Sequence, residues 1–146
     1  MAVHIQQAAS EVFYGFSREE ELTNFNTGVF LGLPWLDYLD VSFNFISNVT
    51  SGVFSGLPAL ATLDMGYNSL TTVPPLDLRN LTSLQLPWNP IPHFLNTSFV
   101  GVPRLTYLDV NNCGLSSVSF GAFAPLTELT SLSLNNNMLT GLPADG

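Results

Sequence analysis

The residues that most often carry out catalysis are few and scattered in this chain. The two histidines, His4 and His93, lie far apart in the sequence, and His93 has no Cys or carboxylate at the spacing of a metal ligand. The chain contains neither the Gly-x-Ser-x-Gly turn of a nucleophilic serine nor a Gly-rich phosphate loop. Its single cysteine, Cys113, excludes an internal disulfide. We therefore expect no enzymatic activity, no metal site and no cofactor, and we look for recognition chemistry.

The charge balance narrows the kind of partner. Eleven acidic residues stand against three arginines and no lysine, which gives a net charge of -8 with only 10% charged residues. Nucleic acids and anionic membrane surfaces are bound through clusters of Lys and Arg, so we expect neither as a partner. Hydrophobic residues make up 46% of the chain, enough to fill a core, but no run approaches the length of a membrane span.

Five copies of one eleven-residue pattern account for much of the leucine and asparagine content. In each copy, aliphatic residues at the first, fourth and sixth positions precede an Asn or Cys at the ninth and another aliphatic residue at the eleventh. The copies begin at Leu36, Leu60, Leu81, Leu105 and Leu129. Their ninth positions, spaced by 24, 21, 24 and 24 residues, are Asn44, Asn68, Asn89, Cys113 and Asn137. This regular recurrence indicates a solenoid of stacked repeats.

The pattern resembles the leucine-rich repeat family, whose L-x-x-L-x-L-x-x-N/C-x-L signature it follows. The second half of the copies is similar to the 24-residue typical class, because Phe54, Phe99 and Phe123 precede short elements such as Gly56-Leu57-Pro58. The resemblance implies a leucine-rich-repeat solenoid of the α/β type. Such a solenoid is a right-handed coil with a parallel β-sheet on its concave face and irregular, 3-10 or short helical outer arcs. The typical class is found mostly in extracellular receptors and adhesion proteins.

The alternation of residues predicts the strands. Apolar and polar residues alternate around the second and third aliphatic positions of each copy, which is typical of a strand with one buried face. Successive strands that run the same way form a parallel sheet with the intervening residues as crossovers. A buried amide at the ninth position can satisfy backbone groups of its own and the next coil. We therefore interpret Asn44, Asn68, Asn89 and Asn137 as a structural ladder, and Cys113 as a small buried residue within it.

The two ends of the chain follow the pattern less well. We divide the chain into residues 1–21, a cap or degenerate first repeat, and a repeat array over 22–146 with about five full strands and no C-terminal cap. A capping box at Ser17-Arg18-Glu19-Glu20 favours a short helix in the first part, whereas Val12-Phe13-Tyr14 favours a degenerate strand; both stay open. In the shortened third copy, Val73-Pro74-Pro75-Leu76 predicts an extended, polyproline-like outer arc.

Side chains between the leucines are expected to line the concave face, where the first three repeats carry an aromatic residue just before the Asn. The candidate ligand-binding residues are Tyr38, Asp40, Phe43, Asp64, Tyr67, Gln85, Trp88, Tyr107, Asp109 and Asn112. Tyr and Trp often dominate binding energy, and carboxylates about 5 Å apart repel by around 1 kcal/mol, which a cationic partner would relieve. We expect a protein or peptide partner with Lys or Arg in its contact patch. The alternative is that Asp and aromatic residues at these positions are common fillers of the family.

Three sequons, at Asn48, Asn80 and Asn96, lie outside the predicted strands and are candidate N-glycosylation sites. The sequence thus favours a non-enzymatic recognition module from an extracellular, cell-surface or secreted protein. The alternative is an intracellular, cytoplasmic scaffold or regulatory subunit on the same fold. Met1 to Ser10 lacks the basic start and apolar run of a signal peptide, which favours this alternative if Met1 is the natural start.

Overall fold

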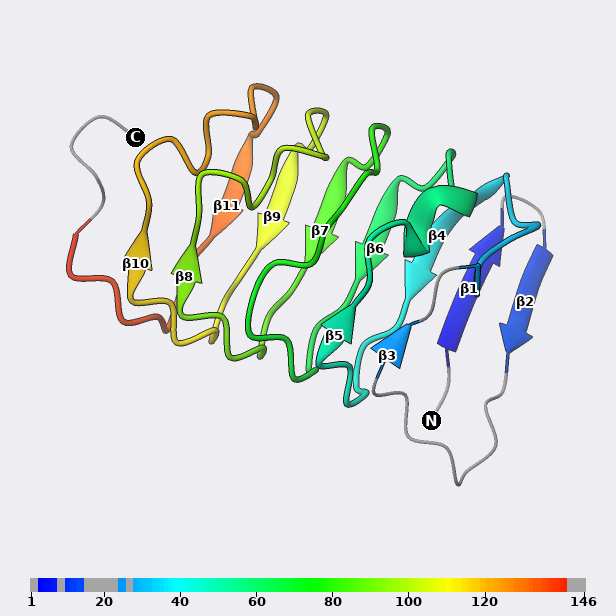
Figure 1. Cartoon of the computed structure of the whole chain (residues 1–146), viewed down its shortest axis with the longest axis horizontal. Coiled ribbons are helices and arrows are strands. Elements are labelled where there is room, and N and C mark those ends of the chain that lie inside the picture. The colour runs from blue at the N-terminus through cyan, green and yellow to red at the C-terminus, as the bar shows by residue number, and fades with distance from the viewer. Residues whose placement is uncertain (1–2, 8–9, 15–23, 26–27, 142–146) are drawn as a thin grey trace.

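The largest element of the structure is a seven-stranded sheet that forms one side of the coil (Figure 1). The computed structural model describes residues 3–7, 10–14, 24–25 and 28–141. Five parallel strands cross the sheet: β4 (Leu36–Asp40), β6 (Thr62–Asp64), β7 (Ser83–Gln85), β9 (Tyr107–Asp109) and β11 (Ser131–Ser133). They lie side by side in chain order, so each repeat contributes one strand and the chain forms the solenoid that the repeat pattern predicted.

The register of the sheet follows the repeat pattern residue by residue. Leu39 lies opposite Leu63, and Leu63 lies opposite Leu84, so the leucines stack into one continuous row. Leu108 and Leu132 extend this row. The side chains of the first four leucines are fully buried, whereas Leu132 on the outermost strand is 38% exposed. Burial of one leucine side chain contributes about 2 kcal/mol to the free energy of folding. The leucines that stack between repeats therefore supply most of the core.

An antiparallel hairpin extends the sheet beyond β4. It consists of β1 (Val3–Gln7) and β2 (Ser10–Tyr14), and β1 pairs antiparallel with β4. The strand alternative for the N-terminal stretch therefore coincides in position with β2, but this strand belongs to a hairpin and not to another parallel repeat. The capping-box segment, residues 17–20, lies outside the described residues, and the division at residue 21 stays a prediction.

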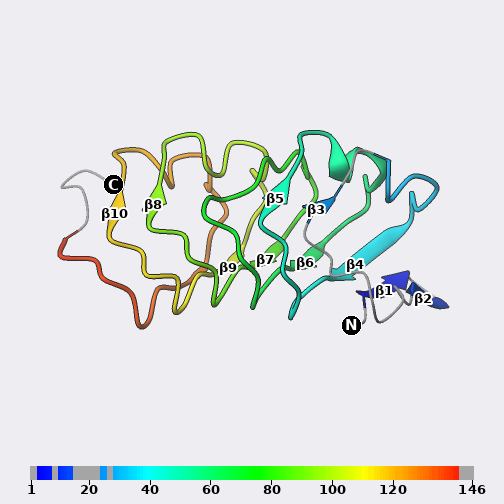
Figure 2. The same cartoon turned by 60° about the horizontal axis from the view of Figure 1, so that its bottom comes forward.

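The outer side of the coil is mostly irregular, as expected for this fold. It holds two small parallel pairs, β3 (Asn24–Phe25) with β5 (Asn48–Val49), and β8 (His93–Phe94) with β10 (Ser117–Val118). A single 3-10 helix, η1 (Val53–Gly56), is the only helix in the described part of the chain. Figure 2 shows these short pairs on the side opposite the main sheet. No helix among the described residues has the length and apolar character needed to cross a membrane.

The short outer arc before Leu81 divides the outer side into two halves. Phenylalanine rings pack on one another in each half: Phe30 stacks on Phe54 at 6.0 Å, and Phe99 stacks on the partly buried Phe123 at 5.9 Å. The short arc lies between these two pairs, and its residues 73–78 have no regular secondary structure. Pro74 and Leu76 of this segment are buried. The polyproline-like conformation predicted for Val73-Pro74-Pro75-Leu76 stays a prediction.

The asparagine ladder connects successive coils through backbone groups. The amide oxygens of Asn68, Asn89 and Asn137 each accept a hydrogen bond from an N–H group of the coil before them. The donors are the backbone nitrogens of Ile46 at 2.9 Å, Leu70 at 3.0 Å and Leu115 at 3.0 Å. The amide nitrogens donate to carbonyl oxygens of both coils; that of Asn68, for example, bonds Val41 and Met65, both at 3.0 Å. Each ladder amide therefore satisfies buried backbone groups that would otherwise cost about 1 to 3 kcal/mol apiece.

The two remaining ladder positions differ. Asn44 donates to the carbonyl oxygens of Val41 and Ser42, but its buried amide oxygen has no partner among the described residues. Cys113 is buried, and its Sγ donates to the carbonyl oxygen of Leu86 at 3.3 Å. Burial raises the pKa of the Cys113 thiol, which keeps it protonated and unreactive.

Candidate recognition surface

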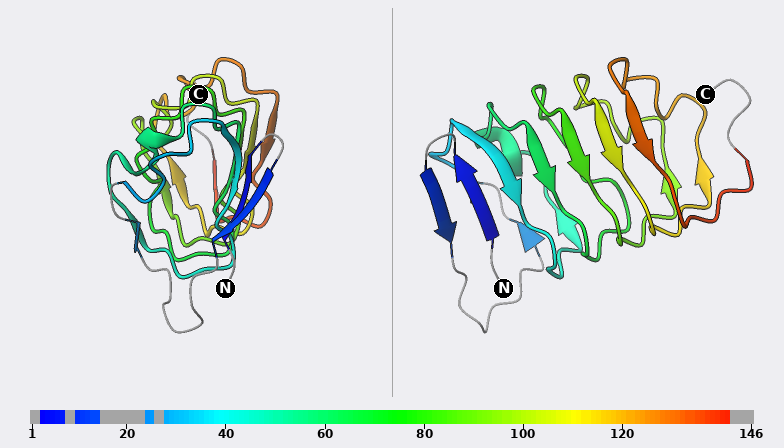
Figure 3. Two further views of the ribbon diagram at one scale, coloured as in Figure 1. Left: turned by 90° about the vertical axis from the view of Figure 1, so that its right-hand side faces the viewer. Right: turned by 180° about the vertical axis from the view of Figure 1, so that it is seen from behind.

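The sheet brings the polar residues between the leucines into two columns on its exposed face, which the right-hand view of Figure 3 turns toward the reader. The column that begins with Asp40 continues through Asp64, Gln85, Asp109 and Ser133. The column that begins with Tyr38 continues through Thr62, Ser83, Tyr107 and Ser131. Tyr38 and Tyr107 are thus separated by two small residues, and the structure does not bring these two candidate residues together.

We refer to Asp40, Asp64 and Asp109 as the acidic row. Each carboxylate accepts a hydrogen bond from the backbone N–H two residues further on. The distances from Oδ1 are 2.8 Å to Ser42, 2.8 Å to Gly66 and 2.9 Å to Asn111. These bonds close a turn at the end of each strand, so the aspartates have a structural role that is independent of any ligand.

In the third repeat, Gln85 takes the place of the aspartate, and the residue that follows it explains this difference. Two residues after Gln85 comes Pro87, which has no N–H group and cannot bond an aspartate. This relationship can be seen in the sequence, because every Asp of the row is followed two positions later by a residue with a backbone N–H that can donate a hydrogen bond. From the sequence, the acidic column is expected either to contact a ligand or to consist of common fillers of the family, and the turn bonds are not among those predictions.

The acidic row also creates an unfavourable local potential. Burial raises the pKa of Asp64, and the carboxylates of Asp40 and Asp109 raise it further, whereas the hydrogen bond from Gly66 lowers it. The pKa of Tyr38 is raised by burial and by the same kind of repulsion, from Asp40 and Asp64. Asp64 lies between Asp40 and Asp109 in the row, so the negative charges of both neighbours act on it.

We refer to Phe43, Tyr67 and Trp88 as the aromatic row. The rings of Phe43 and Tyr67 stack with centroids 4.2 Å apart and an angle of 9° between their planes. The rings of Tyr67 and Trp88 stack at 5.7 Å and 15°. All three remain accessible to solvent, with 67%, 42% and 51% of their surfaces exposed. Three neighbouring repeats thus maintain one continuous stack of exposed rings.

The backbone under the aromatic row is left-handed. Its φ angles are 54° at Phe43, 54° at Tyr67 and 58° at Trp88. This conformation costs roughly 1 to 2 kcal/mol for a bulky residue, whereas Asn and Gly adopt it readily. The equivalent residue of the fourth repeat is Asn112, with φ 57°, a residue type that adopts the left-handed conformation readily.

Hydrogen bonds between coils hold this conformation in place. The backbone nitrogen of Phe43 donates to the carbonyl oxygen of Gly66 at 3.0 Å, and that of Tyr67 donates to Pro87 at 2.8 Å. The same bond joins the nitrogen of Trp88 to the carbonyl oxygen of Asn111 at 3.0 Å. Exposed aromatic rings on a strained backbone are a feature that concentrates at functional sites. The positive φ angles could not be foreseen from the aromatic residues themselves, although the Asn residues at the same position of later repeats were a signal.

The three sequons lie outside the seven-stranded sheet. Asn48, Asn80 and Asn96 are all exposed. The side chain of Asn80 is held in place, because its Nδ2 donates to the carbonyl oxygen of Pro58 at 2.9 Å and its Oδ1 accepts from Arg104 Nη1 at 3.0 Å. Among the described residues, no group of three or more His, Cys, Asp or Glu side chains could hold a metal ion.

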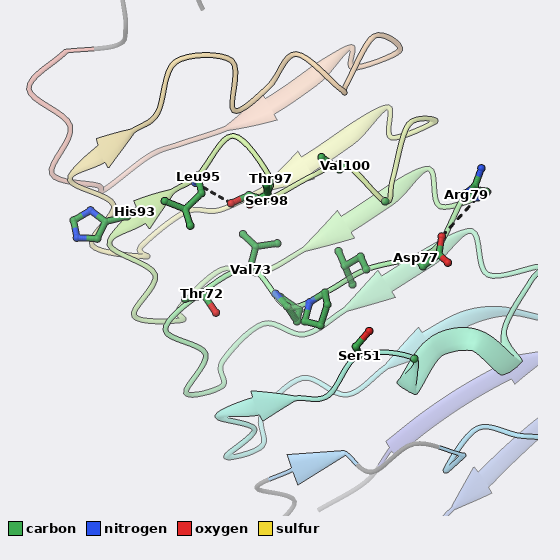
Figure 4. Close-up of a pocket in the computed structure, with 15 residues that line it drawn as sticks. Ser51, Thr72, Val73, Asp77, Arg79, His93, Leu95, Thr97, Ser98 and Val100 are labelled. Carbon is green, nitrogen blue, oxygen red and sulfur yellow. Dashed lines mark hydrogen bonds and ion pairs between the residues drawn. The ribbon is translucent and has the colours of Figure 1, made fainter.

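A second surface feature, a groove of about 630 Å³, lies on the outer side at the short arc before Leu81. Figure 4 shows that its wall combines Val73 of the short arc with Leu95 and Val100 of the following repeat. An ion pair between Arg79 and Asp77, at 3.6 Å, lies at one end. Sequence reasoning predicted the short arc but not the groove, which arises because the neighbouring repeats keep their full length.

Comparison with known proteins agrees with this architecture. The leucine rich repeat family profile matches residues 34–91 and 103–146, which is more than half of the chain. The chain therefore belongs to the leucine-rich repeat family.

Among solved structures, the chain is similar to one in the complex of Toll and Spatzle from Drosophila, with a TM-score of 0.65, 24% identity, and coverage of 70% of this chain and 14% of that one. It is also similar to one in the TLR13–ssRNA13 complex, with a TM-score of 0.68, 25% identity, and coverage of 84% and 21%. Human 5T4, a trophoblast glycoprotein, matches with a TM-score of 0.53, 24% identity, and coverage of 86% and 60%. The chain thus spans less than two thirds of the length of these proteins.

Proposed function

We propose that this chain is a non-enzymatic recognition module that binds a protein or peptide partner on the exposed face of its seven-stranded sheet. The aromatic row and the acidic row together form the contact surface. The partner presents Lys or Arg side chains to the acidic row, which relieves the repulsion that acts on Asp64.

One observation carries this proposal. Phe43, Tyr67 and Trp88 expose stacked rings to solvent on a left-handed backbone that Asn would adopt at lower cost. Stability alone does not favour such a surface, because each of the three residues leaves 42% or more of its surface exposed to solvent. Aromatic residues of this kind frequently dominate the binding energy of protein interfaces.

A display experiment tests the proposal. Random peptides displayed on phage would be selected on the immobilised chain and, in parallel, on a variant with Phe43→Asn, Tyr67→Asn and Trp88→Asn. We expect the wild-type chain to enrich peptides rich in Arg and Lys, and we expect the variant to lose this enrichment while it keeps its fold.

The matched control removes three exposed rings elsewhere. Trp35, Phe45 and Phe120 are 71%, 51% and 68% exposed and do not belong to the aromatic row. A variant with Asn at these three positions should enrich the same peptides as the wild-type chain. Equal enrichment by the wild-type chain and the aromatic-row variant would refute the proposed surface.

We infer an extracellular or cell-surface location, with glycans on the outer side of the coil. Similarity to a trophoblast glycoprotein and to one chain of the Toll–Spatzle complex supports this location. Mass spectrometry of the chain secreted from a eukaryotic host should find glycans at Asn48 and Asn96. At Asn80 we expect a smaller fraction of glycosylated chains, since its side-chain amide already forms hydrogen bonds with Pro58 and Arg104. Unmodified Asn48 and Asn96 would contradict the inference.

The proposal also specifies a protein partner in preference to a nucleic acid. One of the similar structures is a complex with single-stranded RNA. The present chain has three arginines and no lysine, which is a weak basis for neutralising phosphates. We expect no binding of single-stranded RNA at physiological salt, as measured by fluorescence anisotropy with labelled oligouridine.

A further inference from the structure

The aromatic row ends abruptly at Trp88. One face of its indole ring is turned to Tyr67, with centroids 5.7 Å apart. The equivalent position in the next repeat is Asn112, whose side chain carries no ring. Repeat four lies directly beside Trp88, because the backbone nitrogen of Trp88 donates to the carbonyl oxygen of Asn111. Trp88 is 51% exposed, and among the described residues no second aromatic ring stacks on it.

A negative charge lies in that same repeat. Asp109 precedes Asn112 by three positions and belongs to the acidic row. Its Oδ1 accepts the N–H of Asn111 at 2.9 Å. The two arginines among the described residues interact elsewhere, Arg79 with Asp77 and Arg104 with Asn80, so neither neutralises this carboxylate.

We propose that the face of Trp88 turned away from Tyr67, together with Asp109 and Asn112, binds an arginine side chain of the partner. The guanidinium group continues the stack as its next planar member and occupies the layer of repeat four. Asp109 supplies the opposite charge, and the amide oxygen of Asn112 accepts an N–H. This inference rests on the proposed function and assigns the anchor within it.

The chemistry of the site favours arginine over lysine and over neutral planar groups. A guanidinium is flat, stacks on an indole face and is weakly hydrated, whereas an ammonium is compact and strongly hydrated. Citrulline has nearly the same shape as arginine but no charge. A site that combines a ring face with a carboxylate therefore binds arginine best, lysine less well and citrulline least.

Nuclear magnetic resonance measures this preference directly. The chain has two tryptophans, so the indole N–H signals of Trp35 and Trp88 can be assigned with one Trp35→Phe variant. The probe is the blocked tripeptide acetyl-Gly-Arg-Gly-amide, titrated to about 300 mM because a single contact of this type corresponds to a dissociation constant of tens of millimolar. We expect a saturable shift of Trp88 and none of Trp35. The lysine tripeptide should bind about threefold to tenfold more weakly, and the citrulline tripeptide should not saturate.

Two matched variants locate the site. Asn112→Tyr adds a fourth ring at a position whose left-handed backbone already carries aromatic residues in the first three repeats, and it should cover Trp88 and abolish the shift. Asn136→Tyr adds a ring at the equivalent position of the fifth repeat, with φ 56°, and should leave binding unchanged. Asp109→Asn keeps an oxygen for the N–H of Asn111 and should weaken binding severalfold; loss of fold in any variant would be visible in the same spectra.

The outcomes separate this inference from the proposed function. Absence of a Trp88 shift, equal binding of citrulline, or unchanged binding by Asn112→Tyr would overturn the arginine site. Peptides selected on the wild-type chain would then still depend on the aromatic row if the proposed function is correct. If the wild-type chain and the aromatic-row variant select the same peptides, the proposed function itself fails.

Discussion

The backbone N–H of Ile91 donates to the carbonyl oxygen of Asn89, at 2.8 Å, within its own repeat. The equivalent N–H groups of Ile46, Leu70 and Leu115 instead reach the amide oxygen of the following ladder residue. The ladder residue that follows Ile91 is Cys113, which offers no oxygen. One substitution in the ladder thus changes the hydrogen bonding of the preceding coil.

Cys113→Asn should restore the missing bond. The new amide oxygen would lie 22 positions after Ile91, the same separation as between Ile46 and Asn68, and its nitrogen would replace Sγ as the donor to Leu86. We expect the free energy of unfolding to rise by about 1 kcal/mol, the net contribution of one intramolecular hydrogen bond. Urea denaturation measures it, with Cys113→Ala as the control that should lose about 1 kcal/mol. A loss of stability in Cys113→Asn would show that the larger side chain does not fit this slot.

Gly101→Ala should destabilise the protein strongly. A Cβ atom at Gly101 would overlap the carbonyl oxygen of Leu76, because the short third arc lies directly against the next coil. Gly101 also accepts the N–H of Leu78 at 3.0 Å, so the two segments cannot easily separate. We expect a loss of about 3 kcal/mol or more, measured by thermal unfolding. Gly141→Ala, where a Cβ would meet nothing within 4 Å, is the control and should leave the melting temperature nearly unchanged.

The parts of the fold that could be predicted are those set by the regular recurrence of buried and exposed side chains along the chain. Leu39, Leu63 and Leu84 had to be buried and in register, because each lies in the same position of a repeated alternating segment. The asparagine positions followed from the same spacing. The β1–β2 hairpin could not be predicted in this way, since it occurs once and is set by its pairing with β4 and not by a recurring pattern.

The candidate surface was only partly predictable for a related reason. The columns of Asp40 and Phe43 could be listed from the repeat, because the register places equivalent residues side by side. Their physical roles depend on backbone geometry, which the repeat does not state. The turn bond from Ser42 to Asp40 and the left-handed φ of Phe43 are properties of the strand end, and they emerge only when the coil is built.

The strain under the aromatic row can be measured at Tyr67. Tyr67→Asn and Tyr67→Ala both remove the two stacking contacts, but Asn tolerates the left-handed backbone and Ala does not. We expect Tyr67→Asn to be more stable than Tyr67→Ala by about 1 kcal/mol in urea denaturation. At Leu95, which is 54% exposed with no positive φ, the same pair of substitutions should differ by less than about 0.5 kcal/mol. Equal stability of the two Tyr67 variants would mean that the backbone at Tyr67 is not strained.

Asp64→Asn tests the electrostatic cost of the acidic row. The pKa of Asp64 is raised by burial and by Asp40 and Asp109, so its contribution to stability is fully present below the pKa of the unfolded chain and is lost as pH rises through the higher folded value. Asn removes the charge but keeps an oxygen that can accept the N–H of Gly66. We therefore expect the variant to exceed the wild-type free energy of unfolding at pH 7, by up to about 1 kcal/mol, the repulsion of two carboxylates in water.

The same comparison at lower pH supplies its own control. The advantage of Asp64→Asn should shrink as pH falls toward the pKa of the unfolded chain, because the wild-type carboxyl group is then protonated and uncharged. Asp77→Asn, a change at an exposed aspartate outside the row, should show no such gain at pH 7. If Asp64→Asn is instead less stable than the wild-type chain at pH 7, the charged hydrogen bond to Gly66 outweighs the repulsion. The acidic row would then stabilise the free protein, and a basic partner would no longer be needed to relieve it.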